Sequence, residues 1–281
     1  MEKFSKLYRY LRNSGALESL EINEPSVVKL NSLYRAHCNS YVDDFIHNRL
    51  DQKAQRRLGI PWSESLVRRS LISPQGTIDT GVAALDDGIA CHLAGGTHHA
   101  HYDFASGFCI FNDLAVAALD LLHRRRVDRV LVFDLDVHQG DGTASILRGV
   151  DGAYTVSIHG EKNFPARKAV SDIDVGLPDG SNDDQYLSAV ESTLLLAINS
   201  FQPDLVFFDA GVDVYANDPL GRLAVSLDGL RARERLVLAT LKSFGIPVAT
   251  VIGGGYDDDR EALARRHAMV VEESIAIYSG A

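Results

Sequence analysis

A ten-residue stretch near the middle of the chain combines acids and an imidazole at a spacing that could do chemistry. The stretch FDLDVHQGDG (133–142) places Asp134, Asp136 and His138 two residues apart. Because side chains in an extended strand alternate between its faces, all three would point to the same side. Two carboxylates and an imidazole, such as Asp136, His138 and the more distant Asp213, suit Zn²⁺ with an open coordination position, or Fe²⁺ or Mn²⁺. Taken alone, however, the triplet is more typical of a solvated strand end than of a metal site.

Two adjacent histidines offer proton-transfer chemistry. His98 and His99 lie in the stretch AGGTHHA, which has no regular period to force their side chains apart. Imidazole titrates near neutrality, so the pair could act in turn as base and acid. One buried and one surface histidine is an equally good interpretation of the pair by itself.

A glycine-rich segment near the C-terminus presents a tyrosine. The segment 253–255 is GGG, and Tyr256 follows it. No Lys and Ser/Thr follow in the P-loop arrangement, and the acids at 257–259 would repel a phosphate. Asp259 is better suited to cap the last helix, and the tyrosine hydroxyl to donate a hydrogen bond to a developing oxyanion. Cys109 and the histidines at 37, 47, 92, 101 and 267 belong to no such group that the sequence reveals.

The polar clusters follow predicted strands. Apolar runs predict strands at Ile89–Leu93, Val130–Asp134, Ala153–Ile158, Leu205–Asp209 and Pro247–Ile252. Amphipathic stretches predict helices at Asp113–His123, Asp184–Asn199, Leu227–Phe244 and Asp259–Ile277, after a first part that is helical in character. This alternation predicts a single α/β domain over 1–281, with a predominantly parallel sheet flanked by helices on both faces. Parallel α/β sheets bind ligands beyond the carboxyl ends of their strands, so the clusters should meet at one edge.

Composition narrows the class of protein. A chain of 281 residues that is 46% hydrophobic and 23% charged can bury a sizeable core. Its formal net charge of −10 argues against nucleic-acid binding. Three cysteines without close spacing argue against a disulfide framework, and no apolar run approaches the ~18 residues of a membrane span. We therefore expect a cytoplasmic protein that binds neither nucleic acid nor membrane.

Six motifs occur together in the order and spacing of one family. They are GGTHHA, SGFCIFNDLAVAA, VLVFDLDVHQGDGT, SIHGEKNFP, AGVDVYANDPLG and GGGY. The set resembles the zinc-dependent histone deacetylase family, which has the arginase/deacetylase fold. SIHGEKNFP and SDIDVGLPDG look most like the class IV and bacterial deacetylase-like branch. The match runs from about Leu20 to the C-terminus, and the short strand and loop that family members place ahead of MEKFSKLYRYL are not seen.

The resemblance implies roles for the matching residues. The zinc ligands, with Fe²⁺ as an alternative ion in the cell, would be Asp136, His138 and Asp213. The catalytic residues would be His98, His99, Tyr256, Asp134 and Asp141, with Asp134 bonded to His98 and Asp141 to His99. The substrate channel would be lined by Gly107, Phe108, Phe164 and Leu220. A structural K⁺ would be bound near Asp134, Asp136, His138, Ser157 and Ile158. Close bacterial relatives often have asparagine at the position of Asp141, so we expect His99 to be tuned differently here. No residue matches the rim aspartate of the larger relatives.

The implied activity is removal of an acyl group, most simply acetyl, from N-acylated lysine or a related amine. A zinc-activated water would attack, His99 would accept its proton, and Tyr256 would stabilise the oxyanion. The partner would be an acylated peptide, protein or small amine; oligomeric state is open. The alternatives are a dinuclear-manganese ureohydrolase of the same fold and a non-catalytic acyl-lysine binding protein.

Overall fold

Six parallel strands form one sheet in the computed structural model, which describes residues 2–18 and 20–279. The strands are β1 (Ile89–Cys91), β2 (Val130–Asp134), β3 (Ala153–Gly160), β4 (Ile173–Leu177), β5 (Leu205–Asp209) and β6 (Val248–Val251). Their order is β1-β6-β5-β2-β3-β4, so β5 and β2 are central. These two strands pair in register, and Asp134 and Asp209 lie opposite each other at their carboxyl ends. The predicted α/β fold with a parallel sheet is confirmed.

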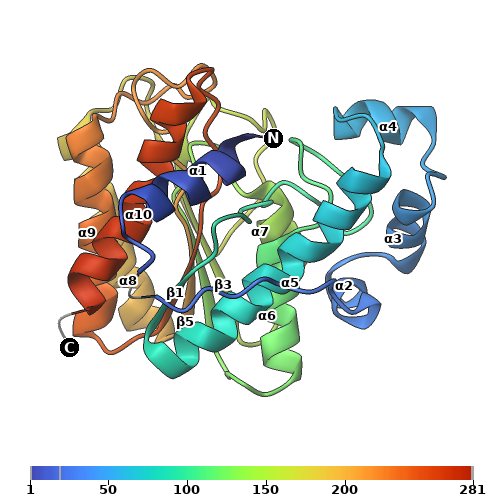
Figure 1. The fold of residues 1–281 in the computed structure, drawn as a ribbon, viewed down its shortest axis with the longest axis horizontal. Coiled ribbons are helices and arrows are strands. Elements are labelled where there is room, and N and C mark those ends of the chain that lie inside the picture. The colour runs from blue at the N-terminus through green and yellow to red at the C-terminus, as the bar shows by residue number, and fades with distance from the viewer. Residues whose placement is uncertain (1, 19, 280–281) are drawn as a thin grey trace.

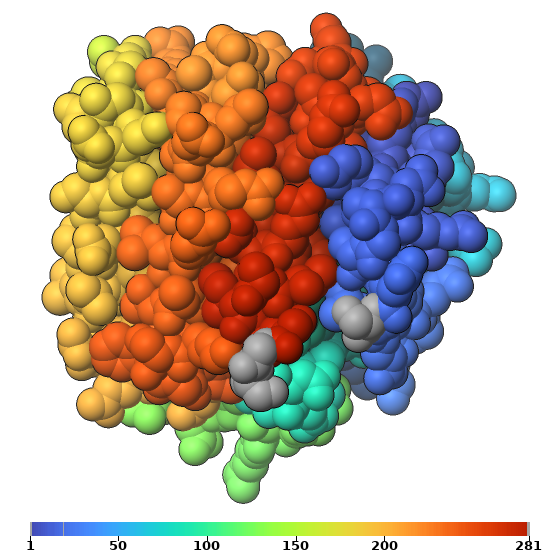
Figure 2. All heavy atoms as spheres, turned by 60° about the vertical axis from the view of Figure 1, so that its left-hand side comes forward, coloured from blue at the N-terminus to red at the C-terminus, as the bar shows by residue number. Residues whose placement is uncertain are grey.

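Ten helices lie among the described residues and cover both faces of the sheet. They are α1 (Glu2–Asn13), α2 (Leu30–Ala36), α3 (Asn39–Ile46), α4 (Gln52–Leu58), α5 (Glu64–Asp87), α6 (Asp113–His123), α7 (Asp141–Leu147), α8 (Asp183–Phe201), α9 (Leu227–Ser243) and α10 (Arg260–Tyr278). Figure 1 shows α8, α9 and α10 on one side of the sheet and α5 and α6 on the other. In Figure 2, α10 lies between α1 and α9. Among the described residues, no helix is long and apolar enough to cross a membrane.

The alternation of side chains along the central strands builds two cores. In β2, Leu131 and Phe133 pack into the core under α8, α9 and α10, and Val130 and Val132 pack into the core under α5 and α6. A strand buried on both faces needs apolar residues at every position, which is why β2 and β5 read as continuous apolar runs.

The sequence predicted the clearly patterned helices and strands and missed the short elements β4 and α7. Val130–Asp134, Leu205–Asp209 and Asp113–His123 have the predicted bounds, and the other predicted strands and helices are confirmed with ends shifted by one to two residues. Strand β4 was not predicted, because it is a half-exposed edge strand that contains a glycine and an aspartate, two residue types that are rare in strands. The short helix α7 was also not predicted. The helical stretches on either side of Pro74 form one helix, α5.

Candidate metal centre and active site

The turn after β2 is fixed by its own acids rather than by strand geometry. The strand ends at Asp134, so the predicted alternation of Asp134, Asp136 and His138 along one strand face is wrong beyond that residue. Asp134 Oδ1 accepts the backbone N–H of Asp136 at 3.0 Å, and Asp136 Oδ1 accepts that of His138 at 2.9 Å. Such side-chain-to-backbone bonds hold a tight turn and aim its side chains. The three residues still share one site, because the turn gathers them.

Asp136, His138 and Asp213 converge as the sequence predicted. Nδ1 of His138 lies 3.0 Å from Asp136 Oδ1 and 3.1 Å from Asp213 Oδ2, and all three residues are buried. The candidate ligand atoms lie within 4.8 Å of one another. The backbone N–H of Val137 donates to Asp213 Oδ1 at 2.9 Å, and Asp213 Oδ2 is left facing Nδ1 of His138.

The charges of this group fit a bound cation. Burial alone would lower the pKa of His138, but the hydrogen bonds to Asp136 and Asp213 outweigh it and raise that pKa to about 10. Burial, and then the neighbouring charge of Asp136, raise the pKa of Asp213 to about 7. Two buried carboxylates therefore favour a positive charge at this position. A set of one imidazole and two carboxylates is suited to Zn²⁺, Fe²⁺ or Mn²⁺.

The tandem histidines face each other beside this group, and each is held by its own carboxylate. His98 Nδ1 lies 2.7 Å from Asp134 Oδ2, and His99 Nδ1 lies 2.7 Å from Asp141 Oδ1. The two Nε2 atoms are 3.1 Å apart, and the His99 ring centroid is 5.8 Å from that of His138. The structure thus places both predicted histidine–carboxylate pairs together.

The two histidines have opposite charge preferences. Burial would lower the pKa of His98, but the charges of Asp134 and then Asp136 outweigh burial and raise it well above its ordinary value. Burial, and then the charge of His98, lower the pKa of His99 to about 4 despite Asp141. The surroundings thus favour the protonated form of His98 and the neutral form of His99.

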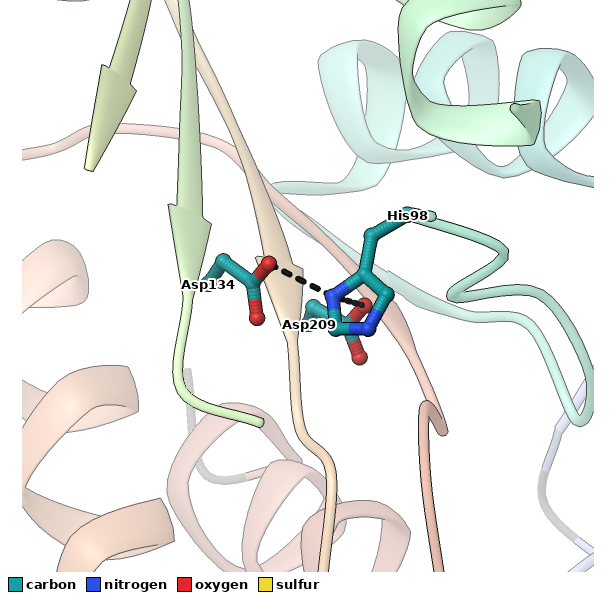
Figure 3. A group of neighbouring side chains, drawn as sticks. All are labelled: His98, Asp134 and Asp209. Atoms are coloured by element: carbon teal, nitrogen blue, oxygen red, sulfur yellow. Dashed lines mark hydrogen bonds and ion pairs between the residues drawn. The ribbon is translucent and has the colours of Figure 1, made fainter. Parts of the chain in front are cut away.

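Asp209 is a site residue that sequence reasoning missed. It ends β5, it is fully buried, and neither of its carboxylate oxygens accepts a hydrogen bond from any of the described residues. Figure 3 shows it with Asp134 around Nδ1 of His98, and its Oδ2 lies 3.9 Å from that nitrogen. Burial, and then the charge of Asp134, raise the pKa of Asp209 well above its ordinary value. The sequence held one indication of this role, because Asp209 ends a predicted strand and directly precedes the motif AGVDVYANDPLG.

Two histidines that the sequence left unassigned support the site. His101 Nε2 lies 3.0 Å from Asp141 Oδ2, so Asp141 is shared between His101 and His99. His37 is fully buried; its Nδ1 donates to the backbone O of His101 at 2.9 Å, and its Nε2 accepts the N–H of Asn112 at 2.9 Å. Asn112 in turn donates to the backbone O of His98 at 3.2 Å. The sequence placed His37 and His101 in no group, and the structure connects both to the tandem-histidine loop.

Tyr256 lies beside the candidate metal group. Its ring centroid is 6.0 Å from that of His138, and its backbone N–H donates to Asp218 Oδ2 at 2.9 Å. Burial, and then the charge of Asp136, raise the pKa of Tyr256 well above its ordinary value, so the phenol keeps its proton and can donate it in a hydrogen bond. Asp218 was not predicted; it also accepts the N–H of Leu220 at 3.0 Å.

Two of the predicted channel residues, Gly107 and Phe164, lie against His99. The Phe164 ring is edge-on to His99 with centroids 4.8 Å apart. Gly107 has φ +53°, and a Cβ there would lie 2.3 Å from His99 Cδ2, so only glycine fits. Phe108 follows Gly107, and Asn163 next to Phe164 donates to the backbone O of Leu220 at 2.7 Å. The side chains of Phe108, Phe164 and Leu220 are about half exposed, as expected at a channel mouth.

The residues predicted to bind K⁺ are adjacent. Ser157 lies opposite Asp134 in the β2–β3 pair, and Ile158 follows it in β3. A small cavity is lined by Asp134, Gly140 and Ser157, among others. The Ser157 hydroxyl lies 3.0 Å from His159 Nδ1.

Comparison with known proteins identifies the family. Residues 1–273 match the histone deacetylase domain. An uncharacterized protein of Picosynechococcus sp. is 44% identical over 278 residues, covering 99% of this chain and 93% of that protein. Histone deacetylase 2 of Arabidopsis thaliana is 29% identical over 264 residues, covering 90% of this chain and 68% of that protein.

A solved structure shares the fold. The acetylpolyamine aminohydrolase of Burkholderia pseudomallei superposes with a TM-score of 0.77 at 23% identity, over 98% of this chain and 90% of that one. With the match over residues 1–273, this shows that the chain belongs to the histone deacetylase domain family and has the arginase/deacetylase fold.

Proposed function

We propose that this chain is a zinc-dependent deacylase that hydrolyses the amide of an N-acylated amine, most simply N-ε-acetyl-lysine or an acetylated polyamine. The observation that carries the proposal is geometric: the tandem histidines, each held by its own carboxylate at 2.7 Å, lie beside a buried group of one imidazole and two carboxylates. Next to a buried group suited to a cation, Asp134 favours the protonated form of His98, and burial beside that charge keeps His99 neutral. Amide hydrolysis needs a neutral base to accept a proton from water and an acid to protonate the leaving nitrogen.

The proposed zinc ligands are Asp136, His138 and Asp213, whose buried carboxylates favour a cation at this position. When bound, zinc would act as a Lewis acid and lower the pKa of water towards ~7. K⁺ is proposed near Asp134, Asp136, His138, Ser157 and Ile158, where the small cavity beside Asp134 and Ser157 supports it.

The chain's own groups then have separate tasks in the proposed reaction. His99 accepts a proton from the attacking water at Nε2, once that nitrogen exchanges its contact with His98 Nε2 for one with the water, and Asp141 holds its Nδ1. The Tyr256 hydroxyl donates a hydrogen bond to the acyl oxygen as negative charge develops on it. When the C–N bond breaks, the leaving nitrogen takes a proton from the histidine pair, so that water and amide give a carboxylate and a protonated amine.

The dinuclear ureohydrolase alternative would need a second ion among His98, Asp134 and Asp209, whose ligand atoms also lie close together. In the structure, Nδ1 of His98 is already paired with Asp134 at 2.7 Å, and its Nε2 faces His99. We therefore favour the mononuclear site. The binding-protein alternative lacks a specific observation in its favour, because the base and the hydroxyl donor are both in place.

A deacylation assay with purified protein tests the proposal. We expect hydrolysis of a fluorogenic acetyl-lysine peptide, of an acetylpolyamine, or of both, inhibition by a hydroxamate, loss on chelation and recovery with zinc. Metal analysis should give about one zinc per chain. Two manganese ions per chain with guanidino hydrolysis would support the ureohydrolase. Acyl-peptide binding without turnover by any acyl-amine would support the binding protein.

A further inference from the structure

A buried arginine bridges the two strand ends that carry the proposed metal ligands. Arg233 lies in α9, and its side chain is completely buried. Its Nη1 donates to the backbone O of Gly211 at 2.6 Å and of Leu135 at 3.4 Å, and its Nη2 donates to that of Ala210 at 3.4 Å. Leu135 follows β2 and Ala210–Gly211 follow β5, so one planar group holds both turns.

The carbonyls that Arg233 holds belong to the backbone next to the ligands. Leu135 directly precedes Asp136, and Gly211 lies two residues before Asp213. A Cβ on Gly211 would lie 2.5 Å from Asp136 Oδ2, so the Gly211 backbone is in contact with this carboxylate. A shift of the Gly211 carbonyl would therefore change the position of both acids.

Stability does not explain this arrangement. Arg233 pairs with Glu234, which is also buried, and within residues 2–18 and 20–279 Arg233 Nε and Glu234 Oε2 have no hydrogen-bond partner. Removing two charges from water costs about as much as their attraction returns, and a well-packed apolar pair is often as stable or more so. The guanidinium does supply something apolar side chains lack, namely several donors in one rigid plane.

We propose that Arg233 is a positioning residue that sets the separation of the Asp136 and Asp213 carboxylates, and thereby the affinity of the site for its metal. The inference rests on the proposed function, because it takes these acids as metal ligands. Groups that orient metal ligands without touching the metal commonly contribute ~10-fold to 100-fold to affinity.

The test replaces the whole ion pair, so that no lone buried charge remains. In the full chain, Arg233→Met with Glu234→Met removes the donors and keeps an apolar core of similar volume. The matched control is Arg235→Met on the same helix, whose side chain is 65% exposed and bonds Glu273 rather than the strand ends. Zinc affinity is measured by competition with a chromophoric chelator, Co²⁺ absorption reports ligand geometry, and urea unfolding of the metal-free proteins reports stability.

We expect the double variant to bind zinc ~10-fold to 100-fold more weakly than wild type, with an altered Co²⁺ spectrum, and the control to match wild type. Wild-type zinc affinity in the folded double variant would overturn the inference, whatever its unfolding midpoint. If the double variant does not fold, the zinc affinity of Arg233→Lys is measured instead. One ammonium cannot span the carbonyls of both turns, so weaker zinc binding supports the inference and wild-type affinity overturns it. A wild-type protein that binds no zinc would instead refute the proposed function.

Discussion

Lowering the pH should destabilise the fold through His37, the buried histidine behind the tandem-histidine loop. Its Nε2 accepts the N–H of Asn112, and its Nδ1 donates to a carbonyl, so the native ring is neutral and both nitrogens are in use. Burial lowers the pKa of His37 from 6.5 to about 4, and the hydrogen bond to His101 offsets only part of this.

The sign and size of the effect follow from these values. Between pH 6.5 and 4 the unfolded chain binds more protons at this position than the folded chain does, so stability falls as pH falls. The difference between 6.5 and about 4 corresponds to a maximum of roughly 3 kcal/mol. Of this, about 2 kcal/mol should be lost between pH 7 and pH 5.

Urea unfolding at pH 7 and pH 5, in the presence of a chelator, measures this loss for wild type and for His37→Gln. Glutamine keeps one donor and one acceptor but does not titrate. Buried His99 and His159, whose pKa values are also lowered to about 4 chiefly by burial, titrate in both proteins and cancel in the comparison. The variant should lose about 2 kcal/mol less than wild type between the two pH values. Parallel losses in the two proteins would refute the reasoning.

Three further predictions concern the site. Tyr256→Phe should lower kcat by ~10²–10³ in the deacylation assay while zinc affinity, measured by chelator competition, stays unchanged. Since burial and the charge of His98 lower the pKa of His99 to about 4, the acid limb of kcat/KM should lie well below pH 6; a limb near 6.5 would contradict a buried neutral base. Lys168 Nζ donates to the carbonyls on either side of Phe164 at 2.6 and 2.8 Å, so Lys168→Met should raise KM roughly fivefold, with less effect on kcat. Exposed Lys162→Met is its control, and equal KM values for the two variants would argue against this role.

Predictions from the sequence succeeded where local pattern and fold geometry agree. The central strands are apolar up to their last residue, an aspartate in each, and the residues that follow parallel strands must gather at one edge of the sheet. Asp136, His138, Asp213 and both tandem histidines could therefore be placed together before any coordinates. The resemblance of the motifs to a known family assigned a specific carboxylate to each histidine, and the structure has both pairs.

The residues that were missed carry no local pattern. Asp209 looks like the last residue of an ordinary strand, and only its register opposite Asp134 brings it to His98. His37 is 75 residues away in sequence from Asn112, which it bonds. Arg233 lies within a helix rich in arginine, and the sequence does not indicate which of its arginines is buried.

The sequence by itself determined the chemistry available at the rim of the sheet, because residue type and strand-end position are both local properties. Only the tertiary structure decided how that chemistry is tuned. The pKa of an imidazole depends on its burial and on the charges beside it, and these come from segments distant in the chain. His98 and His99 are neighbours of the same type with the same unperturbed pKa. The packing of Asp134 and Asp209 around one raises its pKa, and the burial of the other next to that charge lowers its pKa.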